Sequence, residues 1–239
     1  MHPDMTDKAV LIAGGTGGLG RAISLLFLEH GAKVAVTWRR PEEFAALEAA
    51  AGALSARLLG CPAELADPRS AEAVVGRILS AWSRLDALVN AVGGYAGGIK
   101  LWETTPETLD RMLDLNLRAG FALARAVVPA MLARRSGVIV NVAAKAAWDH
   151  AAGASAYAAS KAAALAMMDS LAAELKGSGL RVNSILPSII DTEANRKAMP
   201  DADFAKWPTP EAIARTALFL CSDDAGAVHG AAIPVFGNN

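Results

Sequence analysis

The sequence has few of the features that mark secreted, nucleic-acid-binding or membrane-inserted proteins. Its 239 residues contain two cysteines, Cys61 and Cys221, which fit neither a disulfide framework nor a metal or redox spacing. Aromatic residues make up 5% of the chain and the net charge is -1, so neither a base-stacking surface nor a basic field is expected. No run approaches eighteen strongly apolar residues, and residues 1–8 lack a signal-peptide core. We therefore expect a soluble, cytoplasmic protein that acts on a small molecule, without nucleic acid, membrane or metal.

What the sequence does contain is hydrophobic residues, at 53%, in a regular alternation. Short β-branched or apolar runs alternate with longer alanine-rich stretches of helical character. This alternation predicts a single α/β domain over residues 1–239, a Rossmann-type, doubly wound parallel sheet with helices on both faces. Pro106 is expected in the first turn of a helix capped by Thr104 or Thr105, and Pro129 is expected to kink or end it. Strands are predicted at residues 9–13, 33–37, 56–59, 87–90, 137–142, 181–186 and 232–236.

The first predicted strand leads into a glycine-rich turn and then into an apolar helix. Gly14 would permit the tight turn, Gly18 the close approach of a phosphate, and Gly20 the packing of helix on strand. Strand, glycine turn and helix in this order form the setting in which a helix N-terminus binds a pyrophosphate. We predict dinucleotide binding here, with Thr16 and Leu19 as further contacts; the alternative is a purely structural turn.

The end of the second predicted strand indicates which dinucleotide is bound. An acidic residue at this position would hold the ribose diol of NAD, but this chain has Trp38, followed by Arg39 and Arg40. A guanidinium can pair with a 2′-phosphate and stack on adenine. NADP(H) is therefore the expected cofactor and NAD(H) the alternative, unless both arginines are merely solvated charges.

Tyr157 and Lys161 are four residues apart in an alanine-rich stretch, which places them on one face of a predicted helix. A cation beside a phenol favours the phenolate and lowers the phenol pKa from about 10 toward the range useful for proton transfer. The pair predicts a general acid. The alternative is a surface tyrosine beside a solvated lysine.

Taken together, these motifs resemble those of the short-chain dehydrogenases/reductases over essentially the whole chain. The resemblance implies that Tyr157 transfers the proton, that Lys161 lowers its pKa and holds the nicotinamide ribose, and that Asn116 helps to place a water on a proton relay. It also implies a homodimer or homotetramer. The further cofactor contacts that it implies are Glu64, Leu65, Asn90, Val92, Gly93, Pro187, Ile189, Ile190 and Thr192.

The sequence departs from the family pattern at the catalytic serine, whose position thirteen residues before Tyr157 is taken by Ala144. One branch of the family, the dihydropteridine reductases, is similar in lacking this serine, in the loop at 93–98 and in a substrate lid around 190–210. Resemblance to that branch implies hydride transfer to a quinonoid dihydropteridine or a similar flat, conjugated acceptor. The substrate residues that it suggests are Ala144, Lys145, Trp148, Tyr95 and Trp207.

Two other functions remain open. The protein could be a carbonyl reductase of 3-oxoacyl thioesters or sugar ketones, in which a donor such as Lys145 replaces the lost serine. It could also be a dinucleotide-binding regulator without turnover, although such a protein would have no use for Tyr157 and Lys161 together. The three aromatic residues could stack on a flat substrate or simply pack their loops.

Overall fold

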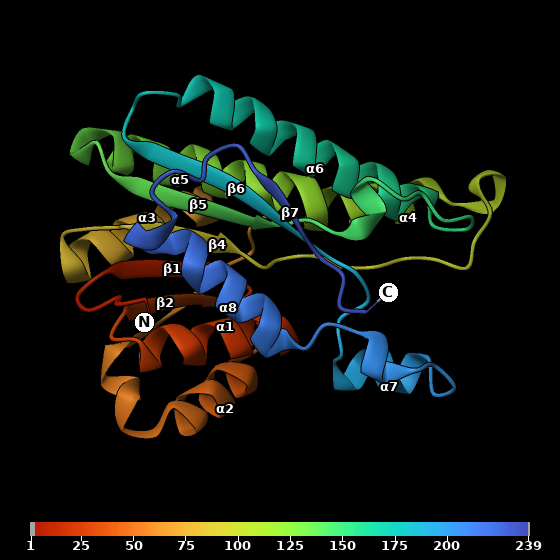
Figure 1. The fold of residues 1–239 in the computed structure, drawn as a ribbon, viewed down its shortest axis with the longest axis horizontal. Coiled ribbons are helices and arrows are strands. Elements are labelled where there is room, and N and C mark those ends of the chain that lie inside the picture. The colour runs from red at the N-terminus through yellow and green to blue at the C-terminus, as the bar shows by residue number, and fades with distance from the viewer. Residues whose placement is uncertain (1–2, 239) are drawn as a thin grey trace.

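The computed structural model of the chain describes residues 3–238, so Met1, His2 and Asn239, the ends of the predicted domain, lie outside the described residues. Its centre is a sheet of seven strands, all parallel, in the order β3-β2-β1-β4-β5-β6-β7 (Figure 1). The predicted fold class is confirmed. The strands are β1 (Ala9–Ala13), β2 (Lys33–Trp38), β3 (Leu58–Pro62), β4 (Ala87–Asn90), β5 (Gly137–Val142), β6 (Leu180–Pro187) and β7 (Ala232–Val235).

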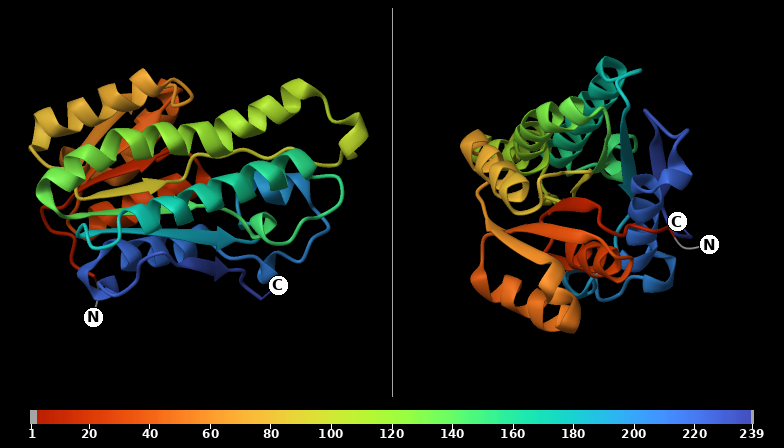
Figure 2. Two further views of the ribbon diagram at one scale, coloured as in Figure 1. Left: turned by 90° about the horizontal axis from the view of Figure 1, so that it is seen from above. Right: turned by 90° about the vertical axis from the view of Figure 1, so that its left-hand side faces the viewer.

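Helices cover both faces of the sheet. On one face, α3 (Pro68–Trp82), the stretch formed by α4 (Pro106–Leu113) and α5 (Ala119–Arg134), and α6 (Ser155–Glu174) lie side by side (Figure 2). On the other face, α1 (Gly18–Glu29) packs against α8 (Pro210–Cys221), and α2 (Pro41–Ala51) lies beside α1 (Figure 1). The short α7 (Glu193–Ala198) precedes α8.

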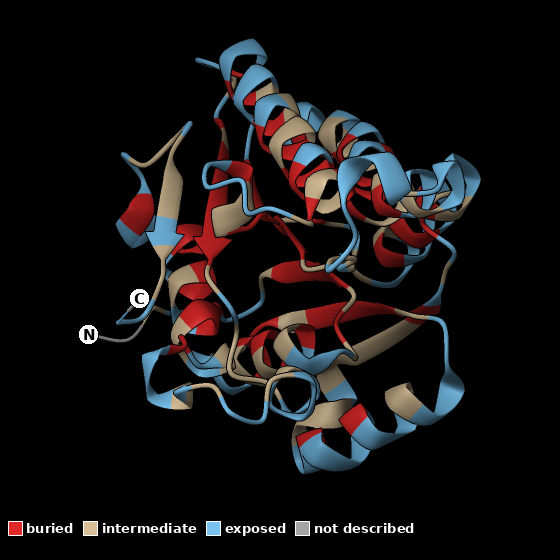
Figure 3. Ribbon diagram, turned by 90° about the vertical axis from the view of Figure 1, so that its right-hand side faces the viewer, coloured by how far each residue is buried: buried red, intermediate tan, exposed pale blue. Residues whose placement is uncertain are grey.

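The two faces bury two separate cores, because alternate side chains of each strand point to opposite sides. In β1, Leu11 and Ala13 belong to the core under α3 and α5, whereas Val10 and Ile12 belong to the core under α1 and α8. The buried residues therefore lie along the strands and the inner helix faces (Figure 3). This two-sided burial explains why the strands read as continuous apolar runs.

Two sequence predictions of local structure need correction. Pro129 does not end its helix, since α5 continues to Arg134 with the proline inside. The third strand begins later than predicted, because residues 52–57 form a 3-10 helix and β3 runs from Leu58 to Pro62. The predicted cap is confirmed as Thr105, whose Oγ1 accepts a hydrogen bond from the Thr108 amide at 3.3 Å.

The helical stretch Pro106–Arg134 is long and apolar enough to cross a membrane by length and composition, with a mean hydropathy of 1.3 in its most apolar window. In this protein it packs against α3 and α6, and 44% of its most apolar window is buried. The core helix of a globular enzyme meets the same criteria, so the stretch is weak evidence for a membrane span.

The strand order fixes where a ligand would bind. Successive strands run outward from β1 to β3 and then in the opposite direction from β4, so the topology reverses between β1 and β4. In open parallel sheets, ligands bind beyond the carboxyl ends of the strands at such a switch point. The glycine turn after β1 and the loop after β4 both begin there.

Candidate active site

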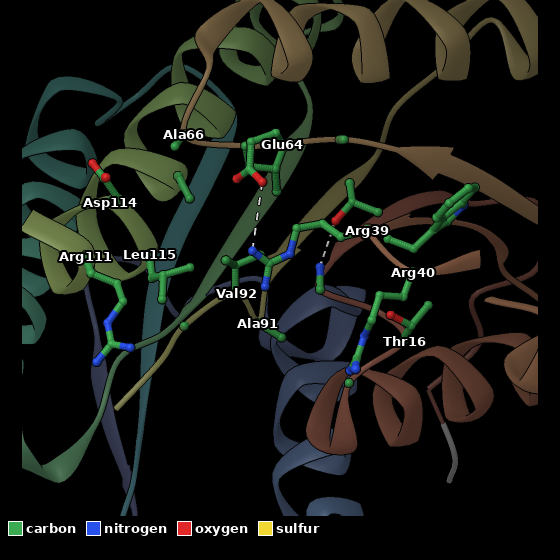
Figure 4. Close-up of a pocket in the computed structure, with 18 of the residues that line it drawn as sticks. Thr16, Arg39, Arg40, Glu64, Ala66, Ala91, Val92, Arg111, Asp114 and Leu115 are labelled. Carbon is green, nitrogen blue, oxygen red and sulfur yellow. Dashed lines mark hydrogen bonds and ion pairs between the residues drawn. The ribbon is translucent and has the colours of Figure 1, made fainter. Parts of the chain in front are cut away.

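A cavity of about 1120 Å³ opens at this switch point (Figure 4). Its walls come from the glycine turn, the ends of β2 and β3, the loop after β4 and one side of α4. The size suits a ligand larger than a simple metabolite. The predicted cofactor residues that line it are Gly14, Thr16, Trp38, Arg39, Arg40, Glu64, Leu65, Val92 and Gly93.

The glycine turn has the geometry that its sequence predicts. Gly14 has a φ of +73°, and its amide donates a hydrogen bond to Thr37 Oγ1 at 2.9 Å. A Cβ on Gly20 would lie 2.0 Å from the Gly14 carbonyl oxygen, so only glycine allows α1 to approach the turn this closely. In the described chain, α1 has neither a side-chain cap nor an acidic residue in its first turn, which leaves its N-terminal amides for an anion. The turn therefore fits the pyrophosphate of a dinucleotide.

Carboxylates accompany both arginines at the end of β2. Arg39 Nη1 lies 3.9 Å from Glu64 Oε2, and this pair extends across the cavity (Figure 4). Arg40 forms an ion pair with Glu43, whose other oxygen accepts a hydrogen bond from Thr16 Oγ1 at 3.2 Å. Both arginines are paired with carboxylates and are also well exposed to solvent, at 65% and 69%, so a 2′-phosphate would have to compete with Glu64 and Glu43 for them.

Trp38 occupies the position where an acidic residue would bind the ribose of NAD. Its ring stacks on Phe44 of α2, with centroids 5.9 Å apart and planes 16° apart. Its indole nitrogen is buried and has no hydrogen-bond partner among the described residues. The indole provides no carboxylate for a ribose diol, so the end of β2 does not favour NAD(H) over NADP(H).

Tyr157 and Lys161 both lie in the first two turns of α6. Burial raises the pKa of Tyr157 to about 12, and the neighbouring Tyr95 phenol adds to the rise. Burial lowers the pKa of Lys161 to about 8, and its ammonium donates a hydrogen bond to the Val142 carbonyl at 3.0 Å. In this structure desolvation of the phenol dominates, so the net shift of the Tyr157 pKa is upward, and the lowering expected from Lys161 stays a prediction.

Asn116 holds the loop after β4 in place. It lies in a π-helical turn between α4 and α5, a local feature found at many functional sites. Its Oδ1 accepts a hydrogen bond from the Gly94 amide at 2.9 Å, and its Nδ2 donates to Gly94 O and Ser160 Oγ, both at 3.0 Å. A Cβ on Gly93 would lie 2.9 Å from Asn116 Oδ1 and 3.1 Å from Lys161 Nζ. Because Gly93 has no side chain, the Lys161 ammonium and the Asn116 amide can both approach its backbone.

The other cofactor residues implied by the resemblance lie outside the lining of the cavity. Asn90 is buried, donating to Asn141 Oδ1 at 3.0 Å and accepting from the Val92 amide at 3.3 Å, so it shapes the loop. Thr192 caps α7, and a Cβ on Gly18 would lie 3.4 Å from its methyl group, so the segment predicted to be a lid begins opposite the glycine turn. The predicted cofactor residues outside the lining are Gly18, Leu19, Gly20, Asn90, Tyr157, Lys161, Pro187, Ile189, Ile190 and Thr192.

The five proposed substrate residues have different environments. Ala144 is buried at the end of β5, and Lys145 forms an ion pair with Asp149 at 3.3 Å. Trp148 and Tyr95 are exposed, at 50% and 68%. Trp207 is buried against Phe204, with ring centroids 5.0 Å apart, so it packs the lid and does not offer a stacking surface.

Several cavity residues were missed by the sequence analysis. Thr37 anchors the glycine turn, Glu43 binds Thr16, and Arg111 extends from α4 toward the cavity on the side opposite Arg40 (Figure 4). Leu115 lies one turn after Arg111, so both side chains are on one face of the helical stretch that carries Asn116. This four-residue spacing was the signal in the sequence that could have placed them at the cavity. In the described part of the chain, no three His, Cys, Asp or Glu side chains are placed to hold a metal ion.

Known proteins share both the sequence pattern and the fold. The family model for short chain dehydrogenases matches residues 8–203. The 3-oxoacyl-[acyl-carrier-protein] reductase FabG of Thermotoga maritima is 31% identical, with 96% of each chain covered. D-threitol dehydrogenase of Mycolicibacterium smegmatis is 34% identical over 96% of this chain and 92% of its own. A short-chain type dehydrogenase/reductase structure from Mycobacterium ulcerans is 25% identical, with a TM-score of 0.93 over 98% of this chain and 90% of that one.

Proposed function

The chain belongs to the short-chain dehydrogenase family, whose members use NAD(H) or NADP(H), and from this premise we propose that it reduces a carbonyl group to an alcohol. A 3-oxoacyl thioester or a sugar ketone is the proposed substrate class. The support is that the relatives described above are named for 3-oxoacyl reduction and for threitol oxidation. The single observation that carries the proposal is Tyr157, a partly buried phenol with a raised pKa that lies four residues before Lys161 in α6.

The proposed reaction needs one hydride and one proton. A reduced nicotinamide, when bound, would supply the hydride for the carbonyl carbon. Tyr157 donates its hydroxyl proton to the carbonyl oxygen, so the product is the alcohol and Tyr157 is left as a phenolate. Lys161 favours that phenolate as it forms, and solvent then returns the proton. The raised Tyr157 pKa suits the direction of reduction, because the acid form predominates before the reaction.

The proposed cofactor is NADP(H). Its pyrophosphate would bind at the glycine turn and the N-terminus of α1, and Arg39 and Arg40 would pair with the 2′-phosphate. Lys161 would bind the nicotinamide ribose. Support comes from the absence of an acidic residue at the end of β2, where Trp38 stands.

A quinonoid dihydropteridine is the second proposed substrate class, because Ala144 provides no hydroxyl for a ketone oxygen. A conjugated acceptor that is already polarised needs only one proton from Tyr157. The comparisons name relatives of carbonyl and alcohol chemistry, so we place the pteridine second.

The test follows NADPH and NADH oxidation with a 3-oxoacyl thioester, a sugar ketone and quinonoid dihydropterin. Turnover of the ketones supports the first proposal, and turnover of the pterin alone supports the second. Cofactor binding without turnover of any substrate would indicate a regulator. Tyr157→Phe should abolish turnover while leaving NADPH affinity almost unchanged, and a loss of binding would contradict its assigned role.

We also propose that the protein is a cytoplasmic homodimer or homotetramer. Support comes from two apolar side chains on α5, Phe121 and Leu132, which are 52% and 41% exposed. Apolar side chains on a regular helix are a common basis for association between identical chains. Light scattering of the purified protein gives the number of chains directly.

A further inference from the structure

The carbonyl chemistry proposed above leaves one position of the site without a donor. A carbonyl oxygen that accepts a hydride gains negative charge, and one missing hydrogen bond to such an oxyanion costs about 10²- to 10³-fold in rate. Ala144 has only a methyl group. Lys145, the replacement suggested by the sequence, is engaged by Asp149 and lies over the Phe236 ring, with Nζ 5.6 Å from its centroid. Another donor is needed.

Tyr95 is the polar side chain in contact with the Tyr157 ring. The two rings meet edge to face, with centroids 5.0 Å apart and an interplanar angle of 75°. Tyr157 comes from α6, whereas Tyr95 comes from the loop after β4. Tyr95 is 68% exposed, so the residue is accessible to an incoming substrate. The proximity of the two phenols is also one cause of the raised Tyr157 pKa.

The loop that carries Tyr95 is fixed at both ends. On one side, the Gly94 amide and carbonyl are both bound by the Asn116 side chain, at 2.9 and 3.0 Å. On the other side, the Ile99 amide donates to the Gly153 carbonyl at 3.1 Å, two residues before α6 begins. These two anchors attach the loop to the elements that carry the catalytic residues. Tyr95 is therefore held beside Tyr157 by the backbone of its own loop.

Gly97 determines where the Tyr95 hydroxyl lies. A Cβ on Gly97 would lie 1.9 Å from the Tyr95 phenol oxygen and 2.4 Å from Cζ, far inside van der Waals contact. The phenol can fold back over the loop only because Gly97 has no side chain. A side chain that merely pointed into solvent would not need this space.

We propose that the Tyr95 hydroxyl donates the second hydrogen bond to the substrate carbonyl oxygen, in place of the hydroxyl missing at Ala144. Tyr157 transfers its proton to that oxygen, and Tyr95 keeps its own proton while stabilising the charge that develops there. This role rests on the proposed carbonyl reduction. It makes Asn116 a positioning residue for Tyr95, because Asn116 binds both polar groups of the Gly94 backbone.

Tyr95→Phe tests the proposal, because it removes the hydroxyl and keeps the ring that packs on Tyr157. We expect kcat for a ketone to fall by about 10²-fold, with NADPH affinity and thermal stability unchanged. Ala144→Ser in the Tyr95→Phe background should recover part of the lost rate, since it returns a hydroxyl to the family position. Trp102→Phe, a change at a 78% exposed aromatic residue outside the site, is the matched control and should leave kcat unchanged.

Two results would overturn the proposed role of the Tyr95 hydroxyl, and a third would overturn the proposed function. Wild-type kcat in Tyr95→Phe would show that the hydroxyl is not used. A loss of rate that Ala144→Ser does not recover would contradict the claim that the Tyr95 hydroxyl takes the place of the one missing at position 144. Absence of ketone turnover in the unmodified protein, with Tyr157→Phe indistinguishable from it, would instead refute the proposed function on which the role depends.

Discussion

The Thr16 hydroxyl of the glycine turn donates a hydrogen bond to Glu43 Oε2, 3.2 Å away at the start of α2. The same carboxylate forms an ion pair with Arg40. A negative charge therefore lies between the glycine turn and an arginine that we assign to the 2′-phosphate of NADP(H). Glu43 would repel that phosphate and compete with it for Arg40.

Glu43→Gln should therefore shift the cofactor preference toward NADPH. The amide can still accept a hydrogen bond from Thr16, but it no longer neutralises Arg40. We expect the ratio of kcat/KM for NADPH to that for NADH to rise by about 5-fold, the effect of a partly exposed charge pair of about 1 kcal/mol. Glu42→Gln, at an exposed neighbour, is the control. A ratio that stays constant or falls would contradict the competition.

Removing Arg39 should shift the cofactor preference away from NADPH. Among the described residues its guanidinium is paired with Glu64 alone, at 3.9 Å, and both side chains are more than half exposed, so this pair is weak and easily displaced by a phosphate. Arg39→Ala should raise KM for NADPH by about 10-fold or more, the value of a charge-assisted hydrogen bond, and change KM for NADH little. Arg215→Ala, at an exposed arginine of α8, serves as the control. Equal effects on both cofactors would exclude the phosphate contact.

Substitution by alanine should have opposite effects on stability at two helical glycines. A Cβ on Gly20 of α1 would lie 2.0 Å from the Gly14 carbonyl, whereas a Cβ on Gly76 of α3 would meet nothing within 4 Å. Gly20→Ala should destabilise the fold by about 1–3 kcal/mol and weaken dinucleotide binding, because the turn must move. Gly76→Ala should stabilise it by about 0.5–1 kcal/mol, since alanine favours helix. Urea denaturation and cofactor titration of both variants measure the two effects, and equal stabilities would refute the close approach.

The sequence predicts most of this fold because each central strand is a buried apolar run. The predicted bounds of β1, β4 and β5 agree with the structure, and each of these strands lies between two other strands of the sheet. The edge strand β3 was misplaced because it contains Gly60 and Pro62, which are poor strand formers. Gly60 is needed there, since a Cβ would lie 2.5 Å from the Phe44 ring. The need for glycine at this position comes from a contact with a residue distant in the sequence, so the residues around Gly60 do not reveal it.

The candidate site likewise contains residues that local sequence predicts and residues that depend on contacts between distant segments. The glycine turn and the arginines at the end of β2 are local patterns, and the structure brings them to one cavity. The pKa of Tyr157 depends on burial by distant segments, so a four-residue spacing to Lys161 could not predict its direction. Glu43 was missed for a related reason, because its contact with Thr16 joins residues 27 positions apart.

Lys161 provides a final prediction, on stability and pH. Its ammonium is buried, and in the described structure its hydrogen-bond acceptor is the Val142 carbonyl, so its pKa is lowered from 10.5 to about 8. Between pH 8 and pH 10.5 the unfolded chain therefore holds more protons at this residue than the folded chain does. The free energy of unfolding should rise with pH over that interval, by up to about 3 kcal/mol. Above pH 10 the raised pKa of Tyr157 acts in the opposite direction, because there the folded state holds the extra proton.

Lys161→Met should remove that rise and also abolish turnover. At pH 7 the variant should be more stable than the natural protein, because a buried charge is replaced by an apolar side chain of similar length. Denaturation of the cofactor-free protein at pH 7, 8, 9 and 10 gives the difference between the two proteins, in which other titrating groups cancel. Lys176→Met, at an exposed lysine just after α6, should keep the rise between pH 8 and 10. A Lys161→Met variant that is less stable at pH 7 would mean that the bond to Val142 outweighs the burial of the charge.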